Sequence, residues 1–138
     1  MRHFLSTADW SREELAGLLD LAADLKADPI RDTLRGKSIA LMFLNPSMRT
    51  RTSFDLGMQQ LGGIAIVLQP GKDAWGVEFE PGAVMEGEAE ELIAEVAGVL
   101  SRYCDLIGIR AFPKFLDWSK DREDGVIRSL AQHASVPV

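Results

Sequence analysis

Two arginines stand among small hydroxyl residues in the stretch FLNPSMRTRTSFD, residues 43–55. Ser47 and Thr50 can donate hydrogen bonds, and the planar guanidinium groups of Arg49 and Arg51 match the oxygens of a phosphate or carboxylate. A proline ends the preceding apolar run, so a helix should begin here with backbone N–H groups that lack intrahelical partners. Such a helix start binds anions, whereas cations are unfavourable there unless an anion lies between them. The stretch predicts a site for a small phosphorylated or carboxylate ligand.

Alternating apolar runs and helical patterns must position these groups. Ser11 and Glu14 are spaced for a capping box at a helix start. The patterns predict helices at residues 11–28, 49–61, 88–103 and 121–133, and strands at 37–44, 64–68, 105–110 and 135–138. The first two strands show little alternation and should be buried on both faces. Strands that alternate with helices indicate an α/β fold: a three-layer sandwich with a parallel sheet of about four strands, in the order 2-1-3-4, and helices on both faces.

In a sheet of this order, ligands bind beyond the carboxyl ends of the strands, where the strand order reverses. That place lies between the first and third strands. Arg110, at the end of the third strand, should therefore approach Arg49 and Thr50. Each feature alone is also typical of a solvated helix start, and only their combination favours an anion site.

Composition excludes several classes of function. The chain has 138 residues, 46% of them hydrophobic, and is interpreted as one domain with its own core. Its formal net charge of −6, with acids and bases interspersed, argues against a nucleic acid partner. No apolar run is long enough to span a membrane, and the start lacks the apolar region of a signal peptide. A cytoplasmic protein is expected.

Other catalytic and cofactor classes lack their motifs. Neither G-x-x-x-x-G-K-[ST] nor G-x-G-x-x-G after a strand is present, which argues against nucleoside triphosphate and dinucleotide binding. A receiver-like signalling domain would need acids at the strand ends, where this chain has arginines. Cys104, His3 and His133 are interpreted as structural, with no metal site and no nucleophile.

Residues 43–55 resemble the Ser-x-Arg-Thr-Arg motif of the aspartate and ornithine carbamoyltransferase family, with Met48 where most members have threonine. Three further stretches, LQPGKDAW, DLIGIRAF and FLDWSKDRED, make the chain most similar to the N-acetylornithine carbamoyltransferase branch. The resemblance covers essentially the whole chain. It implies the carbamoyl-phosphate-binding half of an enzyme of arginine biosynthesis, with no cofactor.

The resemblance also implies roles for the site residues. Ser47, the backbone of Met48, Arg49 and Thr50 would hold the phosphate of carbamoyl phosphate, and Arg110 would contact the phosphate and the carbonyl oxygen. Arg49, Thr50 and Arg110 are accordingly the expected catalytic residues, because they would stabilise charge on the carbonyl oxygen and the departing phosphate. Arg51 is expected instead to form a structural ion pair that holds the loop.

Residues 69–87 form a long predicted loop, in which Trp75 would be hard to bury within its own domain. Family members form homotrimers in which such a loop reaches a neighbour's active site, and the resemblance places Trp75 there. It places Glu90 opposite the acyl group of an N-acylated ornithine, the acceptor substrate. A glutamate there would repel the extra carboxylate of a succinyl group, which favours N-acetylornithine. Taken alone, Glu90 is better explained as an acid at a helix start.

Family members are roughly twice this length or more, and their second half carries a His-Pro-x-Gln motif that this chain lacks. Two hypotheses remain open from the sequence. The chain is either the carbamoyl-phosphate half of an enzyme, inactive by itself, or a module that binds an anion without turning it over.

Overall fold

The computed structural model describes residues 1–79, 91–113 and 117–138, and its centre is a sheet of three parallel strands. These are β1 (Ser38–Phe43), β2 (Ile64–Leu68) and β5 (Leu106–Arg110), in the order β2-β1-β5. The central strand pairs with both neighbours, so that Met42 lies opposite Leu68 on one side and Ile109 on the other. The expected α/β architecture and the order of its first three strands are confirmed.

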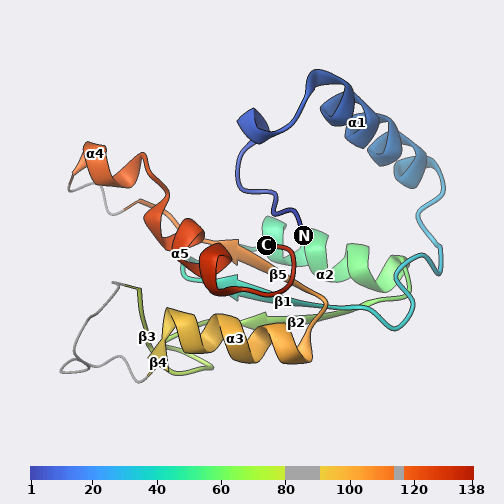
Figure 1. The fold of residues 1–138 in the computed structure, drawn as a ribbon. Helices are drawn as coiled ribbons and strands as arrows, with labels where there is room; N and C mark the ends of the chain where they lie inside the picture. The colour runs from blue at the N-terminus through green and yellow to red at the C-terminus, as the bar shows by residue number, and fades with distance from the viewer. Residues whose placement is uncertain (80–90, 114–116) are drawn as a thin grey trace.

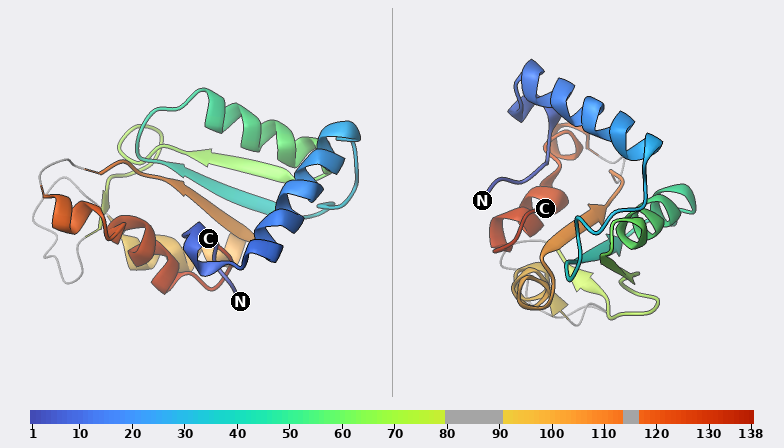
Figure 2. Two further views of the ribbon diagram at one scale, coloured as in Figure 1. Left: turned by 90° about the horizontal axis from the view of Figure 1, so that it is seen from above. Right: turned by 90° about the vertical axis from the view of Figure 1, so that its right-hand side faces the viewer.

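Helices cover both faces of this sheet. The helices of the described residues are α1 (Arg12–Ala27), α2 (Arg49–Gln60), α3 (Ile93–Tyr103), α4 (Trp118–Asp121) and α5 (Gly125–His133), with a 3-10 turn, η1, at Thr7–Asp9, and α2, α3 and α5 are the ones that lie on the sheet (Figure 1). Figures 1 and 2 show α2 on one face and α3 with α5 on the other. The connection from β1 to β2 runs toward one edge of the sheet, and the connection from β2 to β5 runs back toward the other. Because both connections have the same handedness, their helices α2 and α3 lie on opposite faces.

Each face of β1 has its own core. Ala40 and Met42 pack with Ile107 of β5 and with buried side chains of α3 and α5, such as Val96 and Leu130. On the opposite face Ile39, Leu41 and Phe43 pack against Met58 of α2. Alternate residues of one strand thus point into separate cores, so both faces must be apolar, which explains the missing alternation in the sequence.

The second strand differs from the expectation of burial on both faces. Ile64 is 60% exposed and Ile66 is 44% exposed. They share a sheet face with Ala40, but the core on that face contains buried residues of β1 and β5 and none of β2. The prediction was wrong for this face because β2 is an edge strand and the helices cover its neighbours.

The segments after β2 also differ from the expected loop and helix. Residues 77–78 form a short strand, β3 (Val77–Glu78), which pairs in parallel with β4 (Glu91–Leu92). Helix α3 therefore begins at Ile93, later than the predicted start at residue 88, and Glu91 belongs to a strand. The predicted helix at 121–133 is α5, which begins at Gly125 after Asp124 adopts a left-handed φ of 52°.

The two ends of the described chain lie side by side (Figure 1). Phe4 N donates to the Val138 carbonyl at 2.7 Å, and Val138 N donates to His3 Nδ1 at 3.1 Å. Ile107 N donates to the Pro137 carbonyl at 3.0 Å. Proline has no N–H to return, so this segment does not extend the ladder as the expected strand at 135–138. The main sheet has three strands among the described residues, where about four were expected.

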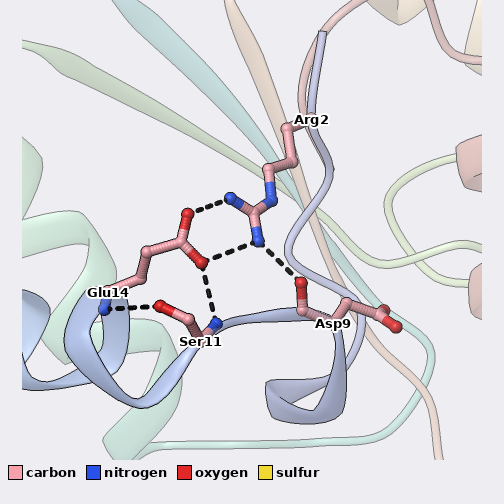
Figure 3. A network of polar contacts seen from close by, with 4 residues as sticks. All are labelled: Arg2, Asp9, Ser11 and Glu14. Carbon is pink, nitrogen blue, oxygen red and sulfur yellow. Dashed lines mark hydrogen bonds and ion pairs between the residues drawn. The ribbon is translucent and has the colours of Figure 1, made fainter.

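The amino-terminal segment is fastened to α1 by the network in Figure 3. The capping box is confirmed, since Glu14 N donates to Ser11 Oγ at 3.1 Å and Ser11 N donates to Glu14 Oε2 at 2.8 Å. The Arg2 guanidinium donates to the Glu14 carboxylate and to the Asp9 carbonyl. Hydrogen bonds from Arg2 and from the Ser11 backbone lower the pKa of Glu14 to about 2.

Helix α1 itself has no buried residue, and Leu19 is 73% exposed. Among the helices of the described ranges, none is both long and apolar enough to cross a bilayer.

Candidate active site

The start of α2 lies just beyond the carboxyl end of β1. Thr50 N donates to Ser47 Oγ at 3.2 Å, so Ser47 caps the helix as the sequence indicated. The N-cap residue itself, Met48, makes no capping bond through its side chain and is 79% exposed. The first turn contains no acid. The positive end of the helix dipole is therefore not neutralised within the turn.

Arg110 reaches this helix start from the neighbouring strand. It lies opposite Phe43 in the ladder of β1 and β5, so both strands end at the same level. Its Nη1 donates to Thr50 Oγ1 at 2.7 Å. Its Nε is buried and has no hydrogen-bond partner among the described residues. The expectation that separate parts of the sequence bring Thr50 and Arg110 to one crevice is confirmed, whereas their catalytic roles stay a prediction.

The arginines around this crevice have no acidic partner in the part of the chain that the structure describes. The ion pairs within residues 1–79, 91–113 and 117–138 involve Arg2, Arg31 and Lys37, and none involves an arginine of the site. Arg49 and Arg51 are both exposed. The ion pair expected for Arg51 is thus not formed with any described residue. Guanidinium groups without an acidic partner among the described residues, beside a helix N-terminus, favour an anion there even in a chain of net charge −6.

Two residues of this crevice were missed by the sequence reasoning. Phe112 N donates to Asn45 Oδ1 at 2.7 Å, which joins the chain after β5 to the chain after β1. The Phe112 ring lies against Arg110, whose Cζ is 4.6 Å from the ring centroid. The sequence marks these two residues only by their position. Each lies two residues after the end of a strand that borders the predicted crevice.

The remaining predicted site residues lie elsewhere or outside the description. Trp75 is 62% exposed and lines a groove of about 210 Å³ with Leu68, Val96, Leu100 and Tyr103, on the α3 side of the sheet. The expectation that its own domain leaves Trp75 uncovered is confirmed, and a role in a neighbour's site stays a prediction. Glu90 lies outside the described residues.

The histidines and the cysteine predicted to be structural have structural surroundings. Cys104 is buried in the core between the sheet and α3. His3 accepts from the backbone of Val138, and His133 Nδ1 lies 2.9 Å from the Ser129 carbonyl oxygen. Across the part of the chain that the structure describes, no three His, Cys, Asp or Glu side chains gather as metal ligands.

Known proteins resemble the whole chain, including the residues of this crevice. Residues 2–138 match the aspartate/ornithine carbamoyltransferase family, carbamoyl-P binding domain. The chain belongs to this family. It is 65% identical to an N-acetylornithine carbamoyltransferase of Xanthomonas campestris pv. campestris over 138 residues. The match covers 100% of this chain and 41% of the relative. An N-succinylornithine carbamoyltransferase of Bacteroides fragilis is 36% identical over 104 residues, covering 75% of this chain and 33% of the relative.

Solved structures of the family share the fold closely. An acetylornithine transcarbamylase complexed with acetylcitrulline superposes with a TM-score of 0.96 at 65% identity, covering 100% of this chain and 41% of that chain. A mutant N-acetyl-L-ornithine transcarbamylase complexed with carbamyl phosphate and N-succinyl-L-norvaline gives a TM-score of 0.97 at 64% identity, covering 100% and 42%. The chain thus spans about two fifths of the length of the carbamoyltransferases it matches.

Proposed function

We propose that residues 1–138 form one domain, the carbamoyl-phosphate-binding half of a cytoplasmic carbamoyltransferase that carbamoylates the side-chain amine of N-acetylornithine. The observation that carries the proposal is the hydrogen bond of 2.7 Å from Arg110 to Thr50 at a helix start without acids. It gathers donors where a phosphate and an adjoining carbonyl oxygen could both be bound. Family membership supports the same ligand.

The reaction explains why such donors are needed. Attack of an amine on the carbamoyl carbon puts negative charge first on the carbonyl oxygen and then on the departing phosphate. In this proposal Thr50 and Arg110 stabilise the carbonyl oxygen, and Arg49, with the Ser47 hydroxyl and the α2 N–H groups, holds the phosphate. Donors fixed before the reaction each contribute several kcal/mol to such a transition state, on the order of 3 kcal/mol per group.

The choice of acceptor follows from the relatives and from one charge. Identity is 65% to the N-acetylornithine carbamoyltransferase of Xanthomonas and 36% to the N-succinylornithine carbamoyltransferase of Bacteroides. We assign Glu90 to the acyl group of the acceptor, where its carboxylate would repel a succinyl carboxylate. N-acetylornithine is therefore the proposed acceptor.

A homotrimer completes the site in this proposal. Trp75 would enter the neighbouring subunit's crevice, where its indole N–H can donate to the phosphate and its ring can exclude water. Its exposure supports this arrangement, as do the apolar residues exposed near its groove, among them Tyr103 at 76% and Val99 at 52%. Exposed apolar residues gathered along one groove are typical of a surface that contacts another protein.

Acceptor selectivity tests the proposal. A full-length carbamoyltransferase that carries residues 1–138 should show the highest kcat/KM with N-acetylornithine, well above ornithine and N-succinylornithine. Glu90→Ala should raise the relative rate with N-succinylornithine, and Glu91→Ala, a neighbouring glutamate, serves as the control. Equal kcat/KM for all three acceptors would contradict the proposed substrate.

The second candidate function is anion binding without turnover, and the length of the chain favours it for these residues in isolation. They span 41% of the Xanthomonas relative. Effects of residues that act as a unit are strongly non-additive, so half of a site retains little of its rate. The purified 138-residue chain should bind carbamoyl phosphate weakly and form no N-acetylcitrulline. Product formation by that chain would refute the assignment to a half-site.

A further inference from the structure

We propose that Asn45 and Phe112 are positioning residues that aim the Arg110 guanidinium at Thr50 and the start of α2. This inference rests on the proposed function, because it concerns the orientation of the cation that would bind carbamoyl phosphate. Neither residue needs to touch the substrate. Each acts through Arg110.

The Arg110 side chain has few restraints of its own. Its backbone is fixed in β5, and its carbonyl accepts from Leu44 N at 3.0 Å. Beyond the backbone, its only hydrogen bond to a described residue is the one from Nη1 to Thr50 Oγ1, and Nε has no partner among those residues. A long side chain held at one atom loses freedom of rotation about several bonds when it binds a ligand, and that loss of entropy weakens binding.

The Phe112 ring supplies the missing restraint. Arg110 Cζ lies 4.6 Å from the ring centroid, within the range of a favourable cation–π contact. The guanidinium is therefore restrained by two contacts, the ring at Cζ and the Thr50 hydroxyl at Nη1. Phe112 is 54% exposed, so burial in a core does not fix its own position.

Asn45 fixes Phe112 instead. Its side-chain oxygen accepts from Phe112 N at 2.7 Å, while its backbone leads through Pro46 into Ser47. One amide thus couples the end of β5, which carries Arg110, to the loop that enters α2. An aspartate could accept the same bond, but its charge would oppose an anion in the crevice. A neutral acceptor suits the position.

The test is a thermodynamic cycle with Arg110. Carbamoyl phosphate affinity is measured by isothermal titration for the protein and for Asn45→Ala, Phe112→Leu, Arg110→Ala and the two doubles with Arg110→Ala. Asn45→Ala and Phe112→Leu should each weaken binding roughly three- to tenfold, the effect of one cation–π contact or one hydrogen bond. Neither should weaken it further when Arg110 is already alanine. Phe112→Trp, which keeps an aromatic face, should restore near-normal affinity.

Controls separate positioning from stability and from the proposed function. Phe54→Leu removes another half-exposed ring, 48% exposed, and should leave affinity unchanged. An undiminished loss in the Arg110→Ala background, or no loss in the wild-type background, would overturn the positioning role. If Asn45→Ala fails to fold, Phe112→Leu and Phe112→Trp give the same decision. Unchanged affinity for Arg110→Ala alone would instead contradict the function proposed for the site, whatever Asn45 does.

Discussion

Nη1 of Arg110 donates a hydrogen bond of 2.7 Å to Oγ1 of Thr50, although the two residues are 60 positions apart. The bond exists because β1 and β5 are adjacent parallel strands that end together, with Phe43 opposite Arg110. It brings the last residue of β5 to the first turn of α2. Topology, and not sequence proximity, therefore assembles the proposed carbamoyl phosphate site.

Thr50→Val in a full-length carbamoyltransferase that carries these residues should lower kcat/KM about 10- to 100-fold. Valine keeps the shape and β-branching of threonine but removes the hydroxyl that Arg110 uses, and a hydrogen bond to a charged group contributes about 1.5–3 kcal/mol. Thr52→Val, an exposed position of the same helix, is the matched control. Equal losses for both variants would show that the Thr50 hydroxyl has no special role.

Arg49→Ala and Arg51→Ala should separate sharply in steady-state kinetics. Arg49 is assigned to the departing phosphate, so its loss should reduce kcat about 100- to 1000-fold, as for other preorganised donors. Arg51 is exposed and has no ion pair with a described residue, and its loss should change kcat by less than about tenfold. A near-normal rate for Arg49→Ala would contradict its assigned contact.

Trp75 should act on a neighbouring subunit. Subunits carrying Arg49→Ala and subunits carrying Trp75→Ala should each be nearly inactive, and mixing them should restore part of the activity. Some sites of a mixed trimer would then pair an intact Arg49 with an intact Trp75 from next door. If native mass spectrometry verifies the mixed trimers and they stay as inactive as both parents, this arrangement is excluded.

The Asp105 carboxylate should make the free energy of unfolding depend on pH in the acidic range. Lys37 Nζ donates to it at 2.8 Å and Ser38 N at 2.9 Å, and these bonds lower the pKa of Asp105 below its usual 3.8. A lowered folded-state pKa stabilises the fold at pH values above the unfolded-state pKa, and the contribution disappears as pH falls through the folded-state pKa.

Urea unfolding of Asp105→Asn tests this linkage. The variant should have a lower midpoint than the wild type at pH 7, and the difference should shrink toward pH 3. Asp28→Asn, whose carboxylate is 72% exposed and 3.5 Å from Arg31, should change the midpoint less. A difference between Asp105→Asn and wild type that is constant from pH 7 to pH 3 would contradict the linkage.

Features encoded by local pattern were predictable from the sequence. The Ser11–Glu14 capping box and the Ser47 cap depend on residues three positions apart, and both are present in the structure. The strand at residues 64–68 has the predicted bounds. The crevice between the first and third strands also followed, because alternating strands and helices allow few topologies.

Features decided by tertiary contacts were not predictable. Ile64 and Ile66 have the sequence of a buried strand, yet only the position of β2 at the sheet edge leaves them exposed. The short pairing of β3 with β4 displaces the start of α3 to Ile93, and no local pattern announces a two-residue strand. The bond between Asn45 and Phe112 joins positions 67 apart, and neither residue type is diagnostic.

Carbamoyl phosphate titration followed by amide NMR tests the central claim most directly. As ligand is added to the 138-residue protein, the amide signals of Ser47, Arg49 and Thr50 and the side-chain signal of Arg110 should move together, with one dissociation constant. The same signals should stay in place in Arg49→Ala. No movement of these signals at millimolar carbamoyl phosphate, or movement confined to residues away from the start of α2, would contradict the assignment of this crevice as the carbamoyl phosphate site.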